Sequence, residues 1–168
     1  SGFNPLPRLE FATAMTLGVP SYEETASCLL YEDLDPAVFI EAMNKVLPEN
    51  LHITEAFIFP VTNLRKRESL TTGLWGALYS YKFRDKSIED GFFASEIYGI
   101  FKEQNPQVLV YEEKGIKVKA PVSDKKLRQA IEDFTGKKWF EVVEVIKLKT
   151  LAKPEISGWT AADEDKWR

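Results

Sequence analysis

The sequence contains one cysteine and one histidine in 168 residues, and this scarcity excludes several kinds of chemistry. Cys28 cannot form a disulfide within the chain or build a cysteine–metal site, and His52 has no second histidine with which to hold a metal. His52 also lacks a serine or cysteine at the spacing of a nucleophile–base pair. The glycine-containing stretch "GLWG" at 73–76 has no lysine and no following helix, so it is not a phosphate-binding loop. We therefore expect no catalytic residue, no metal and no cofactor in this chain.

Long hydrophobic runs are missing as well. No stretch approaches the roughly 18 apolar residues that a membrane span needs, and no secretion signal is present, so we expect a cytoplasmic protein without a membrane partner. Hydrophobic residues at 44% and charged residues at 29% are typical of a soluble globular domain. A net charge of −4 argues against a protein that coats itself with nucleic acid, although it leaves room for a local basic patch.

The first part of the chain reads as a short run of strands around one helix. Alternating apolar residues predict two strands that pair as a hairpin, and Asp35 followed by Pro36 predicts the start of a helix that cannot pass Pro48. Another strand follows. The predicted elements are strands at 8–17, 25–32 and 51–59 and a helix between 35 and 48.

The second part carries clearer start and stop signals. A strand is followed by a helix that Ser87 and Asp90 cap, then by a hairpin around Lys114-Gly115, and then by a helix that starts at Ser123 and ends at Gly136. A last strand follows at "WFEVVEVIKLKT", and a helix anywhere within it would contradict this interpretation. The predicted elements are strands at 74–83, 107–121 (as a hairpin) and 139–150, and helices at 87–104 and 123–135.

This order predicts an α+β chain of two ferredoxin-like units with antiparallel sheets, in which the first unit lacks its opening strand and helix. The first unit covers 1–60 as strand, strand, helix, strand. A charged segment without apolar periodicity, 61–73, reads as a linker. The complete second unit covers 74–150, and 151–168 is a tail.

The opening turn supplies a family resemblance. "GFNPLPRLEFATAMTLGVPS", with the later "LDPAVFIEAMNKVLP", resembles the radical-SAM-linked domain of unknown function, which occurs as a C-terminal domain or partner of bacterial radical SAM proteins. The match is specific over 2–60 and thin over 74–120. The family usually has a strand and a helix before the turn, and this chain starts after them.

The resemblance implies a neighbouring radical SAM domain, in the same chain or in another protein. That partner would hold an iron–sulfur cluster through three cysteines and use S-adenosylmethionine, whereas this chain would be an accessory domain. Pairs of ferredoxin-like units also occur in RNA-processing endoribonucleases, which is an analogy of fold alone.

Two groups of side chains are candidate ligand contacts. Asn4 and Arg8 lie in the opening turn, which reads either as a rigid corner or as a ligand-facing loop. Arg65, Lys66 and Arg67 form a basic cluster in the linker, which reads either as a phosphate contact or as a solvated segment.

A strand rich in aromatic residues offers a further alternative. Trp75, Tyr79, Tyr81 and Phe83 could form a base-stacking platform, but packing under the two helices accounts for them better.

Two functions follow from these patterns. The first is a non-catalytic accessory domain of a radical SAM protein that presents RNA or another substrate. The second is an interaction module that docks on a radical SAM partner or forms a homo-oligomer, because an incomplete first unit leaves a sheet edge and apolar surface uncovered.

Overall fold

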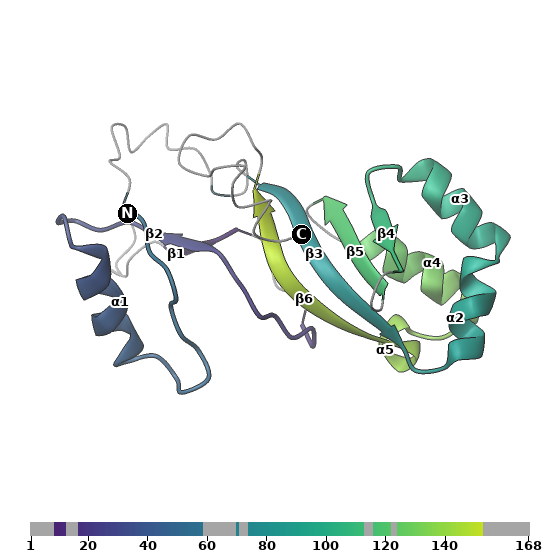
Figure 1. Ribbon diagram of the computed structural model, residues 1–168, viewed down its shortest axis with the longest axis horizontal. Helices are drawn as coiled ribbons and strands as arrows, with labels where there is room; N and C mark the ends of the chain where they lie inside the picture. Colours follow the sequence, from purple (N-terminus) through teal and green to yellow (C-terminus); the bar gives the residue numbers. More distant parts are fainter. Residues whose placement is uncertain are drawn as a thin grey trace, which may run out of the picture. The chain divides into compact units, whose positions relative to one another are not determined.

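The computed structural model describes residues 9–12, 17–58, 70, 74–112, 116–121 and 124–152 (Figure 1). These residues form an α+β fold with two antiparallel sheets, which confirms the predicted class. The chain divides into two compact units. The first comprises Ser1–Glu10 and Ser27–Ser69, and the second comprises Phe11–Ala26 and Leu70–Arg168.

The described elements near the start of the chain are a two-stranded sheet and one helix. Strands β1 (Leu9–Phe11) and β2 (Ala26–Cys28) form the predicted pair, and both cross the boundary between the units. Helix α1 (Pro36–Asn44) begins as expected, because the Asp35 carboxylate accepts a hydrogen bond of 2.8 Å from the Ala37 amide.

The strand predicted at 51–59 is not formed over the described residues 51–58. Its backbone groups find another partner. The Asn44 side chain accepts a hydrogen bond of 2.8 Å from the Ile53 amide and donates one of 3.0 Å to the Ile53 carbonyl. A side-chain amide therefore satisfies the groups that a neighbouring strand would otherwise pair.

The second unit has the predicted ferredoxin-like order. Its four-stranded sheet is ordered β4-β5-β3-β6, all neighbours are antiparallel, and a helical segment follows β3 and another follows β5. Figure 1 shows the helices gathered on one side of this sheet. The elements are β3 (Leu74–Phe83), α2 (Lys86–Phe93), α3 (Glu96–Gln104), β4 (Leu109–Tyr111), β5 (Ile116–Pro121), α4 (Lys125–Thr135), α5 (Trp139–Val142) and β6 (Val143–Ala152).

The core lies between the sheet and these helices. The side chains of Tyr79, Tyr81 and Phe83 on β3 are each less than a tenth exposed and pack against Phe92 of α2 and Ile131 of α4, among others. The core interpretation of these three aromatics is therefore confirmed, and the stacking-platform alternative is wrong for them.

The helix starts differ from the prediction in detail. Asp85, not Ser87, caps α2, and its carboxylate accepts a hydrogen bond of 2.8 Å from the Ser87 amide. That carboxylate has a lowered pKa because the Ser87 hydroxyl and amide both donate to it. The single predicted helix over 87–104 is broken at Ala94, and Ser95 caps a second one. Asp124, rather than Ser123, is the N-cap residue of α4.

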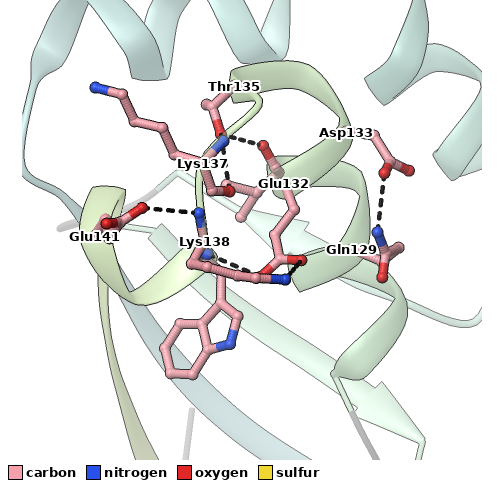
Figure 2. Close-up of polar contacts among 9 residues, drawn as sticks. Gln129, Glu132, Asp133, Thr135, Lys137, Lys138 and Glu141 are labelled. Atoms are coloured by element: carbon pink, nitrogen blue, oxygen red, sulfur yellow. Dashed lines mark hydrogen bonds and ion pairs between the residues drawn. The ribbon is translucent and has the colours of Figure 1, made fainter.

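The last strand begins at Val143, because a short helical turn, α5, occupies 139–142. The prediction of a strand from 139 was wrong at this point, but β6 still pairs with β3 as expected. Figure 2 shows the polar contacts around this helical turn. Glu132 accepts a hydrogen bond of 3.1 Å from the Trp139 amide, and Glu141 accepts one of 3.0 Å from the Lys138 amide. These side chains hold the backbone in a helical turn before the sheet begins.

The segment before β2 belongs to the second unit. Ser21 forms a parallel bridge with Lys147 of β6, the Tyr22 amide donates a hydrogen bond of 3.0 Å to the Lys147 carbonyl, and the Lys147 amide donates one of 2.9 Å to the Pro20 carbonyl. This segment therefore pairs with the outer edge of β6.

Candidate interaction surfaces

All five candidate contacts from the sequence lie outside the described residues. Asn4 and Arg8 precede Leu9, and Arg65, Lys66 and Arg67 lie within 59–69. Whether they share a surface stays a prediction. The described residues offer two other groups of polar side chains, one buried in the core and one on the sheet face away from the helices.

The buried group is centred on Asp124 at the start of α4. Its carboxylate makes no cap hydrogen bond to the helix. Instead, its Oδ2 atom accepts hydrogen bonds of 2.7 and 2.6 Å from Nε and Nη2 of Arg128, and the Tyr81 hydroxyl also donates to it. The Arg128 guanidinium lies over the Trp139 ring at 4.4 Å from its centroid.

The surroundings of Tyr81 and Arg128 favour the protonated form of both side chains. Burial and the Asp124 charge raise the pKa of Tyr81 well above 10, so the phenol keeps its proton. Burial lowers the pKa of Arg128, but the attraction of Asp124 outweighs it and the net pKa is raised. The arrangement is a closed brace between β3, α4 and α5, and it offers neither a base nor a nucleophile.

A second buried ion pair fastens the 20–22 segment to β6. Nζ of Lys147 lies 2.6 Å from Oε2 of Glu24, and the two side chains are 6% and 17% exposed. Tyr79 lies opposite Lys147 in the sheet register. Its pKa is raised to about 12 by burial, with the charges of Asp124 and Glu24 adding to the shift.

The opposite face of the same sheet has a different composition. Val118 and Ala120 of β5 point into the core, so the alternating Lys117 and Lys119 point the other way. Tyr111 of β4 is the direct register partner of Lys117 and is 45% exposed. An aromatic ring and a lysine therefore stand side by side on this face.

The row continues onto β3. Lys117 is the register partner of Ser80 and Lys119 is that of Leu78, while Lys82 lies one alternation further along β3 and is exposed. The buried core residues of β3 and β5, such as Tyr79 and Val118, lie on the opposite face of the sheet. We call the set Trp75, Lys82, Tyr111, Lys117 and Lys119 the lysine-aromatic face.

Trp75 reaches this face through an irregularity in the strand. The pairing of β3 with β6 shifts register between Leu74 and Gly76, so Trp75 is the extra residue of a bulge. Nζ of Lys119 lies over the Trp75 ring at 5.4 Å from its centroid. The favoured core interpretation is therefore wrong for Trp75, whose ring is turned away from the core and paired with a lysine.

The sequence carried a signal for this face that composition alone did not reveal. In "IKVKAP" the lysines alternate with apolar residues, which is the pattern of a strand with one face in the core and one cationic face. The alternation predicts a strand of a hairpin, but by itself it does not mark the lysines as a binding site. Their proximity to Tyr111 depends on the strand register, which appears only in the structure.

Among the described residues, no group of three or more histidine, cysteine, aspartate and glutamate side chains could hold a metal ion. None of the helices in the described part of the chain is long and apolar enough to cross a membrane. Cys28 is a free, half-buried thiol.

A family model described as "Uncharacterized protein conserved in bacteria (DUF2344)" matches residues 1–157. The match extends beyond the stretches that carried the resemblance in the sequence and includes both compact units almost completely. No curated protein and no solved structure matches the chain.

Proposed function

The chain belongs to the DUF2344 family of uncharacterized proteins conserved in bacteria, and we propose that it is a non-catalytic accessory domain that binds single-stranded RNA on the lysine-aromatic face. The observation that carries the proposal is the pairing of Tyr111 with Lys117 as direct neighbours across β4 and β5. A base can stack on the phenol ring while the ammonium group contacts the adjacent phosphate.

The geometry of the face favours an unpaired strand over a duplex. Side chains on neighbouring strands stand about 5 Å apart, so Tyr111 and Lys117 lie close enough for one nucleotide to contact both. Stacking requires bases that are already unstacked from a partner strand, as in loops and single strands. Lys119 supplements the positive charge along the row, whereas Lys82 lies opposite the exposed Glu144 of β6 and adds little net charge there.

The accessory role concerns a radical SAM protein. The opening turn resembles domains that accompany such proteins, and we propose that the partner, in the same chain or in another, supplies the iron–sulfur cluster and S-adenosylmethionine in the bacterial cytoplasm. This chain would contribute the RNA contact and no reacting group, a role consistent with the Asp124–Arg128 and Glu24–Lys147 pairs, whose charged groups are already engaged with each other.

Binding of a fluorescein-labelled oligouridine, followed by anisotropy at two salt concentrations, tests the proposal. Replacing Lys117 and Lys119 by Glu should abolish measurable binding, and replacing both by Ala should lower the salt slope by about 1.4, or roughly 0.7 for each lost phosphate contact. The matched control replaces Lys126 and Lys137 by Glu. Both lysines are exposed on the helix side, and their replacement changes the net charge by the same amount as that of Lys117 and Lys119.

The control variant should retain the affinity of the wild-type chain to within a fewfold. Equal losses in both charge-reversed variants would mean that only net charge matters, and no binding by the wild-type chain at low salt would remove RNA as the ligand. A third variant, with Arg65, Lys66 and Arg67 replaced by Glu, separates the linker cluster from the lysine-aromatic face. If it alone loses binding, the sequence-based contact is right and the sheet face is wrong.

A further inference from the structure

The described residues of the first unit bury very little. No side chain among residues 27–58 is buried, whereas the second unit has a core of enclosed aromatic and aliphatic residues. A compact unit of this kind leaves apolar surface in water that further contacts would cover.

Helix α1 shows the deficit most clearly, because it contains no buried residue. Its inner stripe, Phe39, Ile40 and Met43, is only half-buried. Val38 of the helix is 51% exposed, and Val46, which lies just after the helix ends, is 76% exposed. An ordinary surface helix buries its apolar stripe and turns polar residues outward, whereas α1 leaves apolar side chains in water.

The exposed apolar residues continue on both sides of the helix in sequence. Phe57 is 69% exposed and Leu51 is 55% exposed. Over residues 27–58 the exposed large apolar residues are Leu30, Tyr31, Leu34, Val38, Val46, Leu51, Phe57 and Ile58. Isolated exposed apolar residues are ordinary, but eight of them in this segment leave apolar surface that a partner can cover.

Charge identifies the kind of partner. Residues 27–58 carry six carboxylates and a single lysine, a net charge of −5 with His52 neutral. All six carboxylates belong to exposed residues, and the lysine, Lys45, already pairs with Glu41 at 2.6 Å. The six are Glu32, Asp33, Asp35, Glu41, Glu49 and Glu55.

We propose that the first unit is a docking surface for a protein whose own contact surface is apolar and bordered by lysine and arginine. The apolar residues supply the buried contact, while the carboxylates steer a basic partner and repel an acidic one. The whole first unit, which also includes the sequence positions Arg8, Arg65, Lys66 and Arg67, still has a net charge of −3, so a second copy of this chain would bring like charges together and is disfavoured. A bilayer with anionic lipids is disfavoured by the same repulsion.

The proposal does not depend on RNA binding, which uses the other unit. Its test uses the whole chain and two designed amphipathic helical peptides, each labelled with fluorescein, that share one leucine face. One peptide has lysine on its polar face and the other has glutamate. The lysine peptide should bind at least about tenfold more tightly than the glutamate peptide.

Site variants locate the contact. Replacing Val38 and Val46 by Asn removes apolar surface that is already in water, so it should leave the fold intact and weaken the lysine peptide by about tenfold. The control, Ile100→Asn, alters a residue of α3 in the second unit that is 45% exposed. It should change nothing.

Three results would overturn the inference. The first is no binding of the lysine peptide. The second is a control variant that weakens peptide binding as much as the Val38 and Val46 variant does. The third is a dimer in sedimentation equilibrium that the Val38 and Val46 variant dissociates. The last result would identify a second copy as the occupant of this surface.

Discussion

Arg128 and Asp124 lie one helical turn apart on α4 and form an ion pair in the core, with an Nη2–Oδ2 distance of 2.6 Å and side chains that are 6% and 2% exposed. The carboxylate also accepts a hydrogen bond from Tyr81 on β3, and the guanidinium stacks on Trp139 of α5. Strand β3 and the consecutive helices α4 and α5, which lie far from β3 in the sequence, therefore meet at one charged pair.

Removing one member of this pair should be costly, because the other charge would stay buried without compensation. We expect Arg128→Leu to lower the free energy of unfolding by about 3–5 kcal/mol in a urea titration. The matched control is Lys45→Ala, which breaks a pair whose side chains are both 70% exposed and should cost less than about 1 kcal/mol. Similar losses of stability in both variants would show that the buried Asp124–Arg128 pair stabilises the protein no more than an exposed pair does.

Gly136 and Gly99 allow the effect of backbone conformation on stability to be compared, because an added Cβ atom would meet no other atom at either position. Gly136 ends α4 with a φ of 65°, and an added Cβ atom there would meet nothing within 4 Å. Gly136→Ala should therefore destabilise the protein by about 1 kcal/mol through strain alone. Gly99 lies inside α3 without a positive φ and with the same open space, so Gly99→Ala should stabilise it by about 0.5–1 kcal/mol.

Thermal unfolding of the two variants under identical conditions measures both effects. Shifts of the same sign would contradict the left-handed conformation at Gly136.

The raised pKa of Tyr79 predicts a loss of stability at alkaline pH. In the unfolded chain a tyrosine ionises near pH 10, whereas burial keeps Tyr79 protonated in the folded protein up to a pKa of about 12. Between these values the unfolded state loses its proton first, so the stability that is fully present below pH 10 falls as the pH rises. Urea titrations at pH 9 and pH 11.5 should show a smaller decrease for Tyr79→Phe than for the wild-type chain.

Tyr111→Phe provides the control, because Tyr111 is half exposed on the sheet face. The free energy of unfolding of Tyr111→Phe should fall between pH 9 and pH 11.5 by as much as that of the wild-type chain. If Tyr79→Phe behaves in the same way as Tyr111→Phe, burial of the Tyr79 hydroxyl does not govern the alkaline limb.

The Glu24–Lys147 pair should control how firmly the 20–22 segment holds the edge of β6. Glu24→Gln keeps the shape of the side chain but removes the negative charge beside a buried ammonium group. The Tyr22 amide, which donates to the Lys147 carbonyl at 3.0 Å, should then exchange with solvent deuterium at least about tenfold faster. Amide exchange of Val118 in β5, a fully buried core residue, should change much less, and equal acceleration at both positions would indicate global destabilisation instead.

The second unit was predictable because each of its elements carries its own punctuation. The "NP" at 105–106 ends α3, Gly136 ends α4, and apolar alternation defines β3 and β5. What failed was local. Residues 139–142 form a helical turn instead of the predicted strand, because Glu132 and Glu141 accept hydrogen bonds from backbone amides there. Such side-chain contacts produce no periodic pattern in the sequence.

The lysine-aromatic face could be predicted only in part. The alternation in "IKVKAP" places Lys117 and Lys119 on one face of a strand, but their neighbours follow from register, which depends on pairing between distant segments. Trp75 joins them through a bulge, whose single extra residue reverses the expected side. The Asp124 brace escaped prediction for a related reason, since Asp124 looks like a helix cap and serves instead as a buried counter-ion.

The central claim is that RNA lies on the lysine-aromatic face, and ultraviolet cross-linking of the whole chain to oligouridine tests it most directly. Stacked pyrimidines cross-link to the aromatic side chain beneath them, so mass spectrometry of the digested complex should place the modified nucleotide on the peptide that contains Tyr111. Replacing Lys117 and Lys119 by Glu should abolish that cross-link, whereas replacing Lys126 and Lys137 by Glu should retain it. Cross-links confined to peptides outside β3, β4 and β5, or unchanged by the Lys117 and Lys119 variant, would contradict the account.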